Sequence, residues 1–123
     1  MEELKMNNLQ AGFARVNVTP MMGIGINGYF KDRIADGVLD ELEINAIALR
    51  TGDDTVVLAA IDSCSIASYI LDEFRASVSA ATGLSKEAIY IHTTHLTPIP
   101  KIRECPREPR VLLLNIRSFY FTE

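Results

Sequence analysis

The stretch that decides the fold runs from Thr55 to His95 and reads TVVLAAIDSCSIASYILDEFRASVSAATGLSKEAIYIHTTH. It opens with a continuous apolar run, VVLAAI, which predicts a central strand that is covered on both faces. Past residue 65 the spacing changes, and apolar residues recur at every fourth position, as they do on one face of an α-helix. This row consists of Ile66, Ile70, Phe74 and Val78.

The ends of this helix are marked by two residues. Ser65 is the expected N-cap and Gly83 the expected C-terminal stop, so the helix has about four to five turns. After a short turn at residues 85–87, residues 88–93 return as a strand. A strand, a helix and a second strand within about 40 residues form a βαβ unit, in which the two strands are parallel.

The residues before this unit predict further strands. Ala11–Thr19 alternates in polarity with the period of a strand, and Pro20 is expected to end it. Residues 43–50 and 55–61 are two β-rich runs joined by a turn-forming connector, which indicates an antiparallel hairpin. Residues 21–40 show no sustained period and are expected to form a long, partly ordered loop. The predicted fold is therefore a small α/β domain with a mixed sheet, a β-hairpin, a βαβ unit and one main helix.

Composition and charge narrow the choice of partners. The chain has 123 residues and a net charge of −4, which suits one domain and provides no basic stripe for nucleic acid. The N-terminal residues lack the apolar segment of a secretory signal, and no run approaches the roughly 20 apolar residues of a membrane span. We therefore expect a cytoplasmic protein without a transmembrane segment. Cys64 and Cys105 lie far apart in the sequence and are expected to be free thiols.

Residues 23–28, GIGING, match the GxGxxG pattern of dinucleotide-binding loops. That fingerprint requires a tight turn that leads directly into a helix, and the residues after Gly28 carry no helical apolar stripe. The better interpretation is that the glycines serve the conformation of the loop.

Two histidines, His92 and His95, stand at the end of the last strand of the βαβ unit. Residues three apart on a strand face opposite sides, so both can approach one metal only if the strand ends between them. From the residues alone, a hydrogen-bonded structural role is the better interpretation for each, because a lone histidine more often has that role than the role of a metal ligand. Asp62 ends the buried strand, where α/β proteins place ligand-binding groups, but a carboxylate that caps the following helix explains it as well.

Four stretches, in order, resemble the N-terminal domain of the neutral and alkaline, non-lysosomal ceramidase-like family of zinc amidohydrolases. They are AGFARVNVTP, MGIGINGYFKDRIADGVLDELEINAIAL, TVVLAAIDSCSI and TGLSKEAIYIHTTH, and together they span about residues 11–95. The last one leads to the family's Thr-His-Thr-His-Ser-Gly-Pro zinc motif, in which His95 matches the first histidine. Asn17, Leu39 and Thr97 depart from the residues that are usual in the family.

The resemblance implies hydrolysis of the N-acyl amide of ceramide, with zinc as cofactor and His95 as one metal ligand. In the family the other ligands, a second His, a Glu and a Tyr, come from the longer chain downstream, as does the serine implicated in amide hydrolysis. Because a zinc hydrolase needs about three protein ligands, we expect residues 1–100 to be a partial ceramidase-like domain. Such a domain has no catalytic residue of its own, holds zinc weakly or not at all, and is inactive alone.

The alternative is a small binding or structural protein that kept the scaffold and assembles as a homo-oligomer. A lipid-like N-acyl amide is the ligand that the resemblance implies, and the residues that would contact it are not identified by the sequence. Residues 101–123 form a divergent tail, which begins with six charged residues and two prolines in ten residues. We hypothesise that the tail arises from a reading-frame shift, and translation of the downstream DNA in the other frames tests this.

Overall fold

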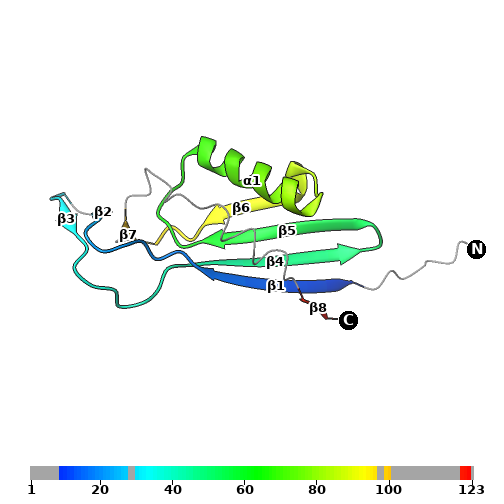
Figure 1. The fold of residues 1–123 in the computed structure, drawn as a ribbon, viewed down its shortest axis with the longest axis horizontal. Coiled ribbons are helices and arrows are strands. Elements are labelled where there is room, and N and C mark those ends of the chain that lie inside the picture. The colour runs from blue at the N-terminus through cyan, green and yellow to red at the C-terminus, as the bar shows by residue number, and fades with distance from the viewer. Residues whose placement is uncertain (1–8, 28–29, 97–98, 101–119, 123) are drawn as a thin grey trace, which may run out of the picture.

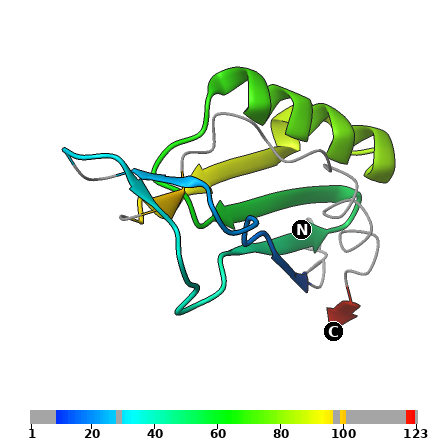
Figure 2. The same ribbon diagram turned by 60° about the vertical axis from the view of Figure 1, so that its left-hand side comes forward.

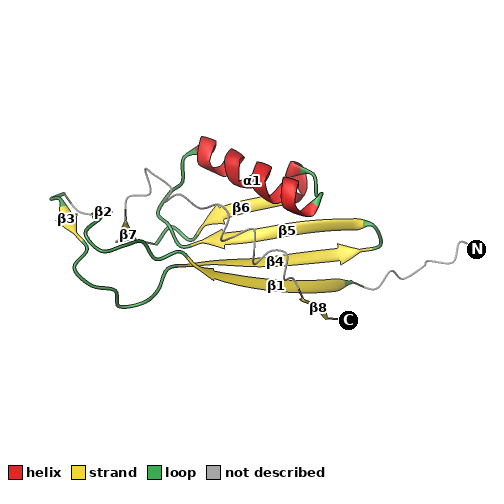
Figure 3. Ribbon diagram, in the orientation of Figure 1, coloured by secondary structure: helices red, strands yellow, loops and turns green. Residues whose placement is uncertain are grey.

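The computed structural model describes residues 9–27, 30–96, 99–100 and 120–122. These residues form strands, one long helix and one short 3-10 helix (Figure 3). The elements are β1 (Gln10–Asn17), β2 (Gly25–Asn27), β3 (Arg33–Ile34), β4 (Glu43–Thr51), β5 (Asp54–Ile61), α1 (Ser68–Thr82), η1 (Lys86–Ala88), β6 (Ile89–Thr93), β7 (Ile99–Pro100) and β8 (Tyr120–Thr122).

The main sheet has the strand order β6-β5-β4-β1-β8 (Figure 1). β4 and β5 form the expected antiparallel hairpin. β5 precedes α1 in the sequence and β6 follows it, and these two strands pair in parallel. β1 pairs antiparallel with β4 and with β8, so three residues of the tail belong to this sheet. The predicted mixed sheet with a hairpin, a βαβ unit and one main helix is confirmed.

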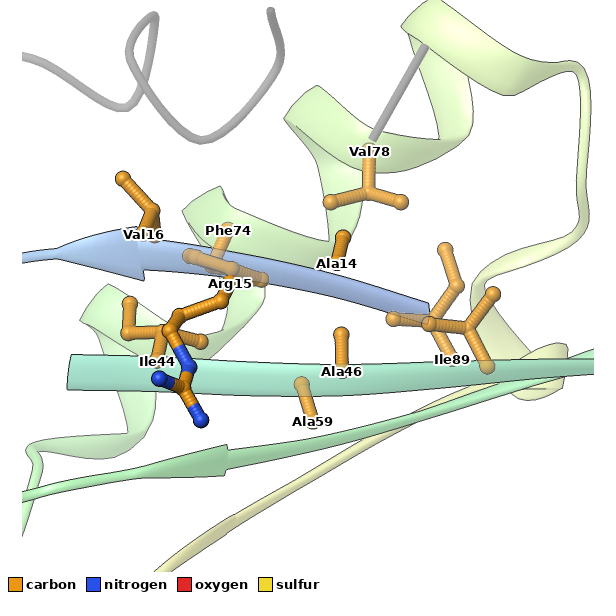
Figure 4. Close-up of a pocket in the computed structure, with 10 residues that line it drawn as sticks. Ala14, Arg15, Val16, Ile44, Ala46, Ala59, Phe74, Val78 and Ile89 are labelled. Atoms are coloured by element: carbon orange, nitrogen blue, oxygen red, sulfur yellow. The ribbon is translucent and has the colours of Figure 1, made fainter. Parts of the chain in front are cut away.

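The hydrophobic core lies between α1 and one face of the sheet (Figure 2). Alternate residues of the strands point to this face, and Val78 from the helix packs against them. The buried residues of this cluster are Val16, Ile44, Ala59, Ile61, Val78, Ile89 and Ile91. This apolar layer contains a cavity of about 10 Å³. Figure 4 shows the side chains that line it, Phe74 and Val78 among them. That volume holds at most about one water molecule, so the cavity is a packing void and not a binding site.

The opposite face of the sheet is more exposed than the sequence predicts. The apolar run in β5 predicts burial on both faces, but the described residues cover only one. No described element covers the face to which Val56 and Leu58 point, and these side chains are 44% and 40% exposed. Phe13 and Tyr90 are exposed on the same face from β1 and β6. We call this surface, formed by Phe13, Ile47, Val56, Leu58 and Tyr90, the open face.

The start of α1 differs from the sequence expectation. The N-cap is Ala67, no side chain caps the helix, and Ser65 lies outside it. Ser65 instead accepts a hydrogen bond through its backbone oxygen from the buried hydroxyl of Ser63, at 3.1 Å. These two serines therefore shape the turn between β5 and α1.

The end of α1 agrees with the expectation. Gly83 is the C-cap, with a left-handed φ of 77°, and its N–H donates to the oxygen of Ser79. A β-carbon at this position would meet no atom within 4 Å, so only the backbone conformation favours glycine here.

We therefore expect Gly83→Ala to lower the free energy of unfolding by about 1 kcal/mol, because alanine adopts a left-handed conformation at a cost. Gly37→Ala is the matched control, since a β-carbon there also meets nothing within 4 Å and no positive φ occurs. Urea denaturation followed by circular dichroism measures both variants. Equal stabilities of the two variants would contradict this account of Gly83.

The glycine-rich segment is more ordered than expected. β2 pairs with β3 and with β7, which gives a three-stranded sheet at one end of the domain (Figure 1). Gly23 has a φ of 88° before β2, and no helix follows among described residues 30–42. The dinucleotide-binding interpretation therefore fails. A loop role is confirmed for Gly23, whereas Gly25 begins β2 and Gly28 lies outside the described residues. β1 ends at Asn17 and not at Thr19, because the Asn17 side chain accepts the Thr19 N–H at 2.8 Å and forms a turn.

Candidate functional site at the carboxyl ends of β5 and β6

The carboxyl ends of the parallel strands β5 and β6 lie at the same end of the main sheet, towards the small sheet (Figure 1). This is where open α/β sheets place ligand-binding groups, because the turns after parallel strands meet there. Residues 62–65 follow β5 and residues 94–96 follow β6. These two turns contain three of the residues that the sequence singled out: Asp62, Cys64 and His95.

Asp62 connects three segments of the chain. Its Oδ2 accepts the N–H of Glu43 at 3.1 Å, and its Oδ1 accepts the Thr94 hydroxyl at 3.1 Å. The N–H of Asp62 in turn donates to the Glu43 oxygen at 3.0 Å. Neither partner of the carboxylate belongs to α1, so the helix-capping interpretation of Asp62 is wrong. The carboxylate instead joins the start of β4 to the turn after β6.

His95 lies in the turn after β6 with a left-handed φ of 55°. No other residue with a side chain has a positive φ in the described part of the chain. Its Nδ1 is 3.0 Å from the backbone oxygen of Cys64. A carbonyl oxygen only accepts hydrogen bonds, so this contact requires a proton on Nδ1 and leaves Nε2 with a lone pair when the ring is neutral. Metal-bound histidines in proteins use the same arrangement, in which the second ring nitrogen donates to a carbonyl or carboxylate.

His92 lies apart from this arrangement. β6 ends at Thr93, so the strand does end between the two histidines, but the His92 ring belongs to the open face with Tyr90. His92 and Leu58 border an open hollow of about 610 Å³ on that face, together with Phe13, Arg15 and Asn45. The ring centroids of His92 and Tyr90 are 6.1 Å apart. Of the two histidines, the structure therefore places only His95 against the Cys64 oxygen, directly after the residue that bonds to Asp62.

Sequence reasoning missed Thr94 and the backbone oxygen of Cys64. Thr94 is an exposed threonine beside a strand end, and its side chain carries no spacing signal. The Cys64 oxygen is a backbone atom, which no residue pattern identifies. Only the pairing of β5 with β6 brings both next to His95.

A complete metal centre is not formed by the described residues. No three or more His, Cys, Asp or Glu side chains come together there in a way that could hold a metal ion. A single histidine does not fix zinc in a hydrolytic site, so these residues alone support no catalytic step through zinc. No helix in the described ranges has the length and apolar character needed to cross a membrane.

The fold has solved counterparts. Its structure superposes on neutral ceramidase from Pseudomonas aeruginosa with a TM-score of 0.69 and 17% sequence identity. The chain is similar in fold to part of a neutral ceramidase. A second structure, a ceramidase complexed with C2, superposes with a TM-score of 0.65 and 17% identity. No protein-family model and no curated protein matched the sequence.

The extent of this similarity matters for function. The match covers 76% of this chain and 16% of each ceramidase chain. The expected resemblance to ceramidases is thus confirmed for the fold. The activity and ligands of a whole ceramidase do not follow from a match to one sixth of it.

Proposed function

We propose that this chain is a partial ceramidase-like zinc amidohydrolase domain that contributes His95 as one metal ligand and is inactive alone. The observation that carries the proposal is the position of His95 on a ceramidase-like fold, at the carboxyl end of β6. Its Nδ1–H donates to the Cys64 oxygen, so the lone pair of Nε2 is available to bind a metal. The remaining donors would have to come from outside the described residues.

In this proposal the chain supplies one oriented metal ligand and none of the groups that react. When complete, a zinc site would activate water for attack on the amide carbon of an N-acyl amide such as ceramide. The residues of this chain would hold and orient one imidazole through Asp62, Thr94 and Cys64. No described residue is assigned as a catalytic acid, base or nucleophile.

We expect the purified 123-residue chain to hydrolyse N-acylsphingosine no faster than its His95→Ala variant. A single imidazole neither holds zinc through dialysis nor stabilises the charge that develops during amide cleavage. Metal content after dialysis and release of fatty acid measure the two effects. His92→Ala is the matched control. It removes the other imidazole of the chain, which lies on the open face and not beside Cys64.

One result would show that the chain alone is active. Stoichiometric zinc retained through dialysis, with turnover lost in His95→Ala but kept in His92→Ala, would mean that ligands from two copies complete a site. The partial-domain proposal would then have to be abandoned.

A second candidate function is a homo-oligomeric binding or structural protein, and the open face favours it. Exposed apolar side chains on several adjacent strands form a surface that proteins usually cover. Arg15 and Glu43 at its border form an ion pair at 3.3 Å, so the charges there are already balanced. A second copy would present the same apolar surface and could pack on it about a two-fold axis.

The partners expected from the sequence remain part of these proposals. A lipid-like N-acyl amide is the ligand class for the first candidate, and a second copy of the chain is the partner for the second. Nucleic acid is not proposed, because the net charge of −4 disfavours binding to phosphates. The cytoplasmic location likewise remains a proposal from the sequence.

A further inference from the structure

Thr94 ties the end of β6 to the end of β5 through both its backbone and its side chain. Its N–H donates to the oxygen of Ile61 at 3.0 Å, which extends the parallel pairing one residue beyond β6. Its hydroxyl donates to Asp62 Oδ1 at 3.1 Å and lies farther, at 3.5 Å, from the Ile61 oxygen. A hydroxyl has one proton to donate, so the shorter contact to the carboxylate is the stronger one.

Asp62 is itself held firmly, because it exchanges two hydrogen bonds with Glu43 at the start of β4. The next residue, Ser63, is 1% exposed and closes the turn through its bond to the Ser65 oxygen. The Cys64 oxygen therefore sits in a turn that is fixed on both sides. Such a fixed acceptor can select one tautomer of the His95 imidazole, whereas a mobile acceptor could not.

The His95 ring is exposed and reaches that acceptor only because the backbone turns into the left-handed region directly after Thr94. This conformation costs roughly 1–2 kcal/mol for a residue with a side chain, so something must hold it. The bond between Thr94 and Asp62 is the side-chain contact immediately before the turn. Without it, an exposed imidazole would sample other rotamers and both neutral tautomers.

We propose that Thr94 and Asp62 are positioning residues that fix the tautomer of His95. Their hydrogen bond keeps the Nδ1–H of His95 donating to the Cys64 oxygen, which leaves Nε2 unprotonated and free to act as a ligand atom. The relevance of this to metal binding rests on the proposed function. The effect on the tautomer is a property of the chain itself and is measured without metal.

The test is a long-range ¹H–¹⁵N correlation spectrum of the histidine rings, recorded above the pH range in which imidazole normally titrates. In the unmodified chain His95 is expected to show a protonated Nδ1 and an unprotonated Nε2. Thr94→Val keeps the shape of the side chain and removes the hydroxyl, and it should lower the ratio of Nδ1–H to Nε2–H at His95 roughly fivefold. Thr94→Ser should restore the original ratio, because serine keeps the donor.

Two controls separate positioning from a general loss of structure. Thr93→Val changes the preceding threonine and should leave His95 unchanged, because the hydroxyl that bonds to Asp62 is that of Thr94. The His92 ring in each sample reports whether β6 remains intact. A His95 that carries its proton on Nε2 in the unmodified chain, or a ratio unaffected by Thr94→Val, would overturn the inference.

Addition of Zn²⁺ to the same samples then tests the proposed function separately. We expect the His95 ring signals to respond at lower Zn²⁺ concentration than those of His92, and this preference to weaken roughly tenfold in Thr94→Val. Equal responses of the two rings, with the His95 tautomer as expected, would count against His95 as a metal ligand and leave the positioning role standing. An unexpected tautomer would remove the positioning role whichever ring binds zinc.

Discussion

Val57→Asp is expected to abolish folding, whereas Val56→Asp, one residue earlier, should leave the chain folded. The Val57 side chain is 2% exposed and lies on the side of the interior strand β5 that faces Phe74 and Val78 of α1, so an aspartate there would bury an unpaired charge. Such a burial costs several kcal/mol or more, and small domains are stable by only about 5–15 kcal/mol. Val56 points to the open face, where an aspartate stays in contact with water.

Far-UV circular dichroism and urea denaturation measure both variants. Val56→Asp should lower the free energy of unfolding by about 1 kcal/mol, the scale of a β-propensity difference. Similar losses in the two variants would mean that the open face is covered as closely as the core face. That result would contradict a sheet that is packed on one side only.

Leu58→Lys is expected to weaken self-association by about tenfold or more. Leu58 lies opposite Ile47 in the β4–β5 pairing, near the middle of the open face, and is 40% exposed. If a second copy packs on this face, burial of the leucine stabilises the complex by about 1.5–3 kcal/mol, and each 1.4 kcal/mol changes the affinity about tenfold. A lysine removes that contribution and places equal charges opposite each other across the two-fold axis.

Sedimentation velocity at roughly micromolar to tens of micromolar concentration measures the effect. Leu39→Lys is the matched control, because Leu39 is 101% exposed and lies in the segment between the two sheets. The unmodified chain and Leu39→Lys should sediment as oligomers and Leu58→Lys as a monomer. A compact monomer for the unmodified chain would remove the second candidate function.

The sequence by itself determined the longer elements of the main sheet and the helix, but not the short strands β2 and β3 of the small sheet. The period of four from Ile66 to Val78 identified α1, Gly83 marked its end, and the two β-rich runs identified the β4–β5 hairpin. These signals are local, because helix periodicity, turn residues and a left-handed C-cap depend on neighbours a few residues away. The resemblance in four ordered stretches also led to the ceramidase fold, which the superposition bears out.

Only the tertiary structure decided which faces are covered and how His95 is held. An apolar run such as VVLAAI reports hydrophobicity but not the number of layers that pack on it, and α1 covers only one side. The contacts of Asp62 with Glu43 and Thr94, and of His95 with the Cys64 oxygen, join residues 19 to 32 positions apart. Such contacts arise from strand pairing, and two of their partners are backbone groups, which leave no signal in the sequence.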